Sequence, residues 1–141
     1  MSKWAVVTGA TAGIGESFTR ILAHEGFNIV LVARDIERMK ERATHLESQF
    51  NVKTEIVQAD LATDDGCAKV EKYIRENQIE VLVNNAGFGI NKAFSVSDIN
   101  SEQQLLDVLV RTPMRLMHTV LPQMKVRNSG SIINVSSVAG W

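Results

Sequence analysis

The feature that most constrains the fold of this chain is a set of short runs whose apolar residues are consecutive. Two examples are Ile29-Val30-Leu31-Val32 and Val81-Leu82-Val83. A strand with one solvent face alternates apolar and polar residues, so an uninterrupted apolar run indicates a strand covered on both faces, as in a parallel sheet. The expected strands are Trp4–Thr8, Asn28–Ala33, Lys53–Gln58, Glu80–Asn84 and Ser131–Ser136.

Segments with helical periodicity separate these runs, and Gly26 follows the first segment where a C-terminal cap belongs. The expected buried stripes are Ile14, Phe18, Ile21 and Leu22, then Ile36, Met39, Ala43 and Leu46, then Cys67, Val70 and Ile74. Strands that alternate with helices predict an α/β fold, a doubly wound parallel sheet with right-handed crossovers. In such a sheet, ligands bind beyond the carboxyl ends of the strands.

A fourth helix is expected to begin at a capping box formed by Ser101 and Gln104 and to continue to Met124. Asp107 and Arg111 have the spacing of an ion pair within this helix. Pro113 lacks an N–H, so the carbonyl of Leu109 should lose its partner and the helix should kink.

Length and composition exclude several classes of protein. The chain has 141 residues and a net charge of −1, which is typical of one globular domain over residues 1–141 and argues against a nucleic-acid partner. Cys67 is the single cysteine and is expected to be buried. No signal peptide or apolar run of about 20 residues is present, so we expect a cytoplasmic protein without a membrane partner. The three histidines form no cluster, and no metal site is expected.

A glycine-rich turn follows the first expected strand and leads into the first expected helix. Its glycines are Gly9, Gly13 and Gly15. Such glycines permit a tight turn and a close approach of a phosphate, and a helix N-terminus offers unpaired N–H groups to a pyrophosphate. The turn lacks the Gly-Lys-Ser/Thr of a P-loop, so its position favours a dinucleotide site.

Three motifs carry a resemblance to a known family. They are the TGxxxGIG pattern at Thr8–Gly15, the NNAG motif at Asn84–Gly87, and the strand with its following serines at Gly130–Ser137. Together they resemble the short-chain dehydrogenase/reductase family, in particular the N-terminal part of its Rossmann-type domain. The resemblance implies about five strands in the order 3-2-1-4-5, without the C-terminal part of the family domain.

The resemblance also implies the residues of the site. It assigns the pyrophosphate to the glycine turn, the adenine to the loop after the third strand and the adenosine ribose to the NNAG turn. For Asn84 and its neighbour Asn85 a purely structural role is equally expected. Ser137 is the implied catalytic residue, whose hydroxyl would hydrogen-bond a substrate carbonyl oxygen or alcohol. The implied cofactor-binding residues are Gly9, Thr11, Ala12, Gly13, Ile14, Gly15, Arg34, Asp60, Leu61, Asn84, Ala86 and Gly87.

The end of the second strand indicates the choice of cofactor. The family's discriminating position is Ala33, which is not acidic, and Arg34 follows it with a guanidinium suited to a 2′-phosphate. NADP is therefore favoured over NAD. Two observations weigh against this choice: Asp35 has the spacing of a ribose-binding acid, and Ala12 stands where many NADP-binding members carry a basic residue.

The implied activity is hydride transfer between a nicotinamide cofactor and a small carbonyl compound or secondary alcohol, by a homo-oligomer. The family's Tyr-x-x-x-Lys motif is absent from the sequence, and Leu109 replaces a frequent asparagine, so the chain alone is expected to be inactive. The alternative is a non-catalytic dinucleotide-binding fragment or a self-associating regulatory module. Its last strand would be an edge, with Ile132, Ile133 and Val135 partly bare.

Overall fold

The computed structural model describes residues 2–137 of the chain. Strands and helices alternate from the N-terminus, as the sequence predicts. In chain order the elements are β1 (Trp4–Thr8), α1 (Gly13–His24), β2 (Asn28–Ala33), α2 (Ile36–Phe50), β3 (Thr54–Gln58), α3 (Asp64–Glu76), β4 (Val81–Asn84), the 3₁₀ helix η1 (Phe94–Val96), α4 (Ile99–Leu106), the π-helical segment η2 (Asp107–Arg111), α5 (Thr112–Arg127) and β5 (Ser131–Asn134).

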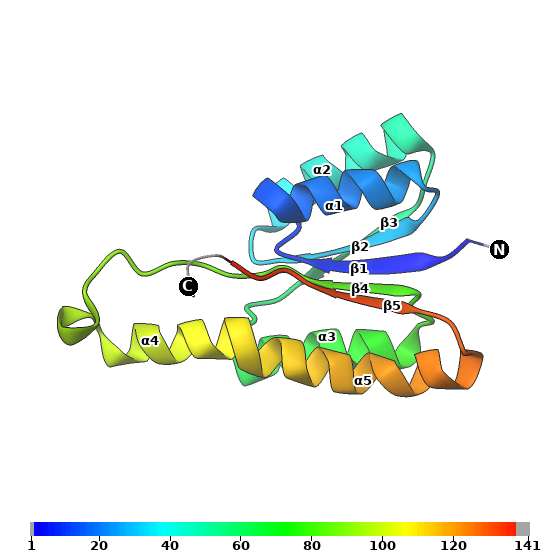
Figure 1. Cartoon of the computed structure of the whole chain (residues 1–141). Helices are drawn as coiled ribbons and strands as arrows, with labels where there is room; N and C mark the ends of the chain where they lie inside the picture. The colour runs from blue at the N-terminus through cyan, green and yellow to red at the C-terminus, as the bar shows by residue number, and fades with distance from the viewer. Residues whose placement is uncertain (1, 138–141) are drawn as a thin grey trace.

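The strands form one parallel sheet in the order β3-β2-β1-β4-β5, which confirms the predicted doubly wound Rossmann-type topology. Helices α1 and α2 cover one face of the sheet, and α3 and α5 cover the other (Figure 1). Helix α4, the segment η2 and helix α5 follow one another and form one long helix. Its α4 end extends past the end of the sheet (Figure 1). Within the described residues, no helix is both long and apolar enough to span a bilayer.

Alternate residues of each central strand enter different halves of the core, which explains the consecutive apolar runs. On β1, Val6 packs in the cluster with Leu82 and Leu116, on the side of α3 and α5. Its neighbours Ala5 and Val7 pack in the cluster on the side of α1 and α2. All five residues are 0% exposed. The central strands therefore have no solvent face and no need for alternating polarity.

The helices α2 and α3 bury the predicted residues, apart from Ile36, which is half-buried, but α1 does so only in part. Ile14 and Ile21 are 58% and 59% exposed, so their predicted burial is wrong. Because α1 begins at Gly13, its sheet-facing side also includes Gly15 and Thr19 rather than these isoleucines. The predicted cap after α1 is confirmed, since Gly26 has φ +89 and its N–H donates to the carbonyl of Ala23 at 3.0 Å.

Helix α4 begins earlier than predicted. Asp98 is the N-cap residue, and its carboxylate accepts the backbone N–H of Ser101 at 3.2 Å. Ser101 therefore lies inside the first turn, and the predicted capping box is wrong. Asp98 was available three residues upstream, and an aspartate is at least as good a cap as a serine.

Pro113 disturbs the long helix as expected, and the disturbance takes the form of the π-helical segment η2. The N–H of Thr112 donates to the carbonyl of Asp107, five residues earlier. A π-helical turn is one way to accommodate a proline that cannot supply the next i→i−4 bond. The predicted ion pair is confirmed, with Arg111 Nε 3.3 Å from Asp107 Oδ1.

The last strand is shorter than predicted and ends at Asn134. It pairs only with β4 among the described strands and so forms one edge of the sheet. Ile132 and Ile133 are half-buried there, as the sequence predicts for an edge strand.

A buried carboxylate joins α3 to α5. The side chain of Glu71 is 8% exposed, and its Oε1 accepts a hydrogen bond from Arg115 Nε at 2.5 Å. Its other oxygen pairs with Arg75 at 3.4 Å, and Cys67 Sγ donates to Oε1 at 3.4 Å. The hydrogen bond from Arg115 lowers the pKa of the Glu71 carboxyl, although burial opposes this shift. Burial raises the pKa of the Cys67 thiol, which is buried as predicted.

Glu71→Gln is expected to lower the free energy of unfolding at pH 7 by about 1.5–3 kcal/mol, because charge-assisted hydrogen bonds are lost. The folded pKa of Glu71 lies below the ordinary 4.5, so the carboxylate stabilises the fold above that value. This contribution is lost as the pH falls from 4.5 through the folded pKa. Urea unfolding of both proteins between pH 7 and pH 3.5 measures the difference. The exposed Glu41, changed to Gln, is the control, and a difference that does not change with pH would contradict the assignment.

Candidate dinucleotide site

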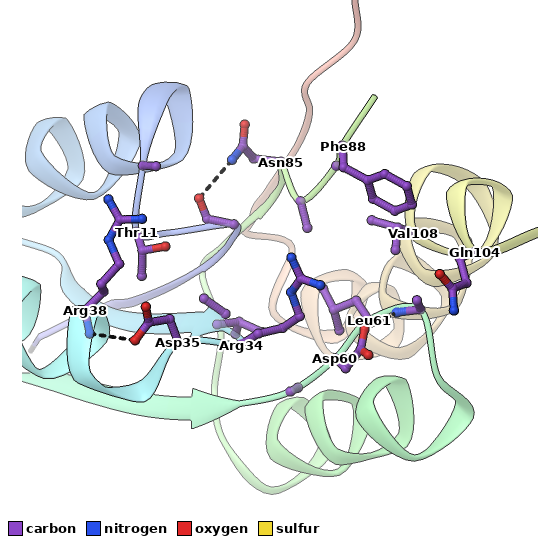
Figure 2. A pocket seen from close by; sticks show the side chains of 18 of the residues that line it. Thr11, Arg34, Asp35, Arg38, Asp60, Leu61, Asn85, Phe88, Gln104 and Val108 are labelled. Atoms are coloured by element: carbon purple, nitrogen blue, oxygen red, sulfur yellow. Dashed lines mark hydrogen bonds between the residues drawn. The ribbon is translucent and has the colours of Figure 1, made fainter. Parts of the chain in front are cut away.

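A cavity of about 1030 Å³ opens at the carboxyl ends of β1, β2, β3 and β4. The turn after β1 contributes Gly9, Thr11, Ala12 and Ile14 to its lining. The loops after the other three strands contribute Arg34, Asp60, Leu61, Ala86 and Gly87. Figure 2 shows these loops around the cavity, with the α4 end of the long helix on the far side from α1. Nine of the predicted cofactor-binding residues therefore meet in one cavity.

The glycine turn leaves the sheet with a backbone that favours glycine. Gly9 has φ +63, and its N–H donates to the carbonyl of Val32 at 2.9 Å. A Cβ on Gly9 would lie 2.8 Å from Asn85 Nδ2. Gly15 does not line the cavity, but a Cβ there would overlap the carbonyl of Gly9, so this glycine sets how closely α1 approaches the turn. Gly13 also lies outside the lining and has φ +55.

One hydroxyl group joins the turn after β1 to the turn after β4. Thr8 Oγ1 accepts the backbone N–H groups of Asn85 at 2.9 Å and Ala86 at 3.0 Å. In return, Asn85 Nδ2 donates to the carbonyls of Thr8 and Gly9, each at 3.2 Å. These bonds fix the NNAG turn against the glycine turn, so Asn85 has the structural role that the sequence left open.

The N-terminus of α1 lacks a side-chain cap. Ala12 is its N-cap residue and makes no side-chain hydrogen bond. The other three α-helices that begin after a loop are capped by side chains that accept a backbone N–H, those of Asp35, Thr63 and Asp98. The first N–H groups of α1 therefore have no acceptor from the cap residue, and the start of this helix borders the cavity through Ala12 and Ile14. This arrangement suits an anionic ligand.

The loop after β2 and the first turn of α2 each bring one guanidinium group to the cavity. Arg34 lines it as predicted, and Arg38 lines it although the sequence analysis did not select it. Asp35 accepts the backbone N–H of Arg38 at 3.1 Å as the cap of α2 (Figure 2). Its carboxylate is thereby engaged at the start of the helix. A signal for Arg38 was present, because it lies four residues after Arg34 and in the first turn of an expected helix.

The loop after β3 is held by its own side chains. Asp60 Oδ1 accepts the N–H of Ala62 at 3.0 Å, and Thr112 Oγ1 donates to the carbonyl of Leu61 at 2.7 Å. The second bond connects this loop to the start of α5. Asp60 and Leu61 form one wall of the cavity, with Val32 and Ala33 beneath.

Besides Gly13 and Gly15, two further predicted residues do not line the cavity. Asn84 is 5% exposed, and its Nδ2 donates to Asn134 Oδ1 at 2.9 Å across β4 and β5. Among the described residues, its own Oδ1 has no hydrogen-bond partner. Ser137 is an exposed residue that follows β5 and is not part of the lining. The roles implied for these two residues stay predictions, and the motif residues 138–140 lie outside the described part of the chain.

The long helix supplies a wall that the sequence analysis missed. Gln104 and Val108 line the cavity opposite the glycine turn, together with Phe88. Their spacing of four residues places them on one side of a helix, but local sequence does not show which loop that side faces. Leu109 covers the neighbouring turn, since a Cβ on Gly87 would lie 2.9 Å from Leu109 Cδ2.

Comparison with known proteins gives a consistent family. The sequence matches the short chain dehydrogenase family over residues 3–141. A curated relative, the very-long-chain 3-oxoacyl-CoA reductase-A of Danio rerio, is 35% identical over 144 residues, which cover 99% of this chain and 45% of the relative. The chain thus spans less than half the length of this relative.

Two solved structures are similar over almost the whole chain. The bulky-bulky ketone specific alcohol dehydrogenase from Comamonas testosteroni has a TM-score of 0.94 and 37% identity, covering 98% of this chain and 56% of that chain. A short-chain dehydrogenase from Sphingobium yanoikuyae in complex with NADPH has a TM-score of 0.94 and 33% identity, covering 98% and 54%. In both structures, the matched part includes the elements that surround the cavity described above.

Proposed function

Because the chain belongs to the short-chain dehydrogenase family, we propose that it forms the NADP-binding part of an oxidoreductase. The reaction is hydride transfer between the nicotinamide and a carbonyl or secondary alcohol of a small molecule. The observation that carries the proposal is the uncapped N-terminus of α1, which borders the cavity beside Gly9 and Gly15, where a Cβ would clash. These are the features that a pyrophosphate requires.

The dimensions and chemistry of the cavity fit a dinucleotide. Its volume of about 1030 Å³ is at the upper end of the roughly 300–1,000 Å³ of ligand pockets. Gly9 and Gly15 exclude any Cβ between the turn and its neighbours. Arg34 supplies positive charge for a phosphate, and Leu61 offers an apolar surface to a base.

Each part of the site has a role in this proposal. When bound, NADPH supplies the hydride. The N–H groups at the start of α1 hold the pyrophosphate, and the Asp60–Leu61 loop holds the adenine. Ala86 and Gly87 border the adenosine ribose, in a turn that Thr8 fixes. Ser137 donates a hydrogen bond to the substrate oxygen in this scheme, which stabilises the charge that develops there.

The guanidinium at the end of β2 favours NADP over NAD. Arg34 is exposed at the cavity, and its carbonyl is fixed by Gln58 Nε2 at 2.9 Å. Ala33 provides no acid for a ribose 2′-hydroxyl, and Asp35 is engaged as a helix cap. The Sphingobium yanoikuyae protein, to which 98% of this chain is similar, was solved with NADPH.

The test is a fluorescence titration of the purified protein with NADPH and with NADH. We expect NADPH to bind at least about tenfold more tightly, since charge-assisted hydrogen bonds contribute about 1.5–3 kcal/mol. Arg34→Gln should remove most of this preference while leaving NADH binding unchanged. Arg20→Gln, on the exposed side of α1, is the control. Failure to bind either dinucleotide would refute the proposed function.

The alternative of a non-catalytic or self-associating module has its own supporting observation. Four exposed apolar side chains lie along the long helix. They are Ile99, Leu106, Val110 and Met114, which are 70%, 57%, 58% and 57% exposed. We propose that the protein forms a homo-oligomer through this surface, and light scattering tests this. If the intact mass exceeds that of the 141-residue chain, ketone reduction that is followed at 340 nm and abolished by Ser137→Ala would support the enzyme. If the intact mass equals that of the 141-residue chain, and the protein binds the cofactor without reducing a ketone, the result would support the module.

A further inference from the structure

The two arginines that line the cavity differ from most other arginines of the chain, because they form no ion pair within the described residues. The chain has eight arginines. Five of them pair with acidic side chains, namely Arg42, Arg75, Arg111, Arg115 and Arg127. Within residues 2–137, no ion pair is formed by Arg20, Arg34 or Arg38, and the last two line the cavity. Unneutralised guanidinium groups beside a cavity are suited to an anionic ligand.

The two side chains approach the cavity from different sides. In Figure 2, Arg34 extends toward Leu61, whereas Arg38 extends along the cavity toward Thr11 in the glycine turn. Arg38 lies in the first turn of α2, and its backbone N–H is fixed by the Asp35 cap at 3.1 Å. Its position therefore depends on a helix and not on a mobile loop.

The glycine turn itself carries no cation. The residues that it presents to the cavity beyond Gly9 are Thr11, Ala12 and Ile14. A group bound between this turn and the end of β2 can obtain a second positive charge from Arg38, which points toward the turn. Both nearby carboxylates, Asp35 and Asp60, already accept backbone N–H groups, so each has part of its hydrogen-bonding capacity occupied.

We propose that Arg38 is a second 2′-phosphate-binding residue, which holds this group from the glycine-turn side while Arg34 holds it from the side of the Asp60–Leu61 loop. This inference rests on the proposed function and adds a specificity residue to it. The 2′-phosphate is a dianion near neutral pH, and two guanidinium forks can together donate to all of its oxygens. Arg38 thus replaces, from α2, the charge that Ala12 does not supply.

The experiment compares two adenosine nucleotides that differ only in the 2′-phosphate. Calorimetric titrations with 2′,5′-ADP and with 5′-AMP give the ratio of their dissociation constants for the wild type, Arg38→Gln, Arg38→Lys and Arg20→Gln. We expect Arg38→Gln to reduce the preference for 2′,5′-ADP about tenfold and to leave 5′-AMP binding unchanged. Arg38→Lys should retain part of the preference, and Arg20→Gln all of it. Thermal unfolding checks that the variants remain folded.

Each other outcome overturns a defined part of the proposal. If Arg38→Gln leaves the ratio of dissociation constants unchanged, even where the binding of both nucleotides becomes weaker, Arg38 does not bind the 2′-phosphate. The proposed function would still be supported by NADPH binding to the wild type. If the wild type binds NADH more tightly than NADPH, the 2′-phosphate subsite is wrong but dinucleotide binding stands. If the wild type binds no dinucleotide, both the inference and the proposed function are wrong.

Discussion

Replacing Gly15 by alanine is expected to weaken NADPH binding at least about a hundredfold. A Cβ at this position would overlap the carbonyl of Gly9 and the side-chain amide of Asn85, so the turn and α1 must separate. The separation would displace the first N–H groups of α1, which the proposed function assigns to the pyrophosphate. Overlap with backbone cannot be relieved by a rotamer change, and preorganised donors lose their geometry when the backbone moves. Fluorescence titration measures the effect.

Gly26 provides a control for the substitution, and Gly13 a comparison within the turn. Gly26 lies after α1 with φ +89, and a Cβ there would have nothing within 4 Å. Gly26→Ala should therefore cost roughly 1–2 kcal/mol of backbone strain without changing NADPH binding. Gly13→Ala, with φ +55 and equally open space, should cost a similar amount of stability. Tight NADPH binding by Gly15→Ala would show that the glycine turn does not hold the pyrophosphate.

Leu82→Ala is expected to lower the free energy of unfolding by about 3 kcal/mol. Leu82 is 0% exposed in β4, where it pairs with Val6 on one side and Ile132 on the other. The truncation leaves a cavity in the cluster that joins the sheet to α3 and α5, and such cavities in protein cores cost about 2–5 kcal/mol. This is a large fraction of the roughly 5–15 kcal/mol that stabilises a typical domain.

Urea unfolding followed by circular dichroism measures the change, with Leu121→Ala as the matched control. Leu121 is 46% exposed on α5, so the same truncation there should cost less than about 1 kcal/mol. A loss at Leu82 as small as that at Leu121 would mean that the core can close around the missing side chain.

The topology and the turn proposed to bind the cofactor follow from short-range patterns in the sequence. The run at Ile29–Val32 is consecutive because β2 is covered on both faces, and this predicts the parallel sheet. The parallel sheet then predicts that Gly9, Arg34, Asp60 and Ala86 meet at one edge, although they are far apart in the chain. Each of these residues lies one or two positions after the end of a strand, so its place depends mainly on where the strand ends.

Residues carried by helices were harder to predict, because helical phase depends on where the helix begins. Ile14 was expected in the core, but α1 begins at Gly13, and Ile14 lies at the cavity instead. Arg38 was missed although the phase of α2 was predicted, because the sequence does not show that the first turn of this helix borders the cavity. Gln104 and Val108 depend in addition on how the long helix crosses the sheet, which long-range packing determines.

We expect the site to form late in folding, because the hydroxyl of Thr8 joins two turns that are distant in the chain. The bonded residues are 77 and 78 positions apart, and contacts of such long range slow folding. A nascent polypeptide that has released only β1, α1 and β2 from the ribosome would carry the glycine turn without the partner that fixes it. Cofactor capture should therefore begin only after β4 has joined the sheet, which makes NADPH a natural reporter of completed folding.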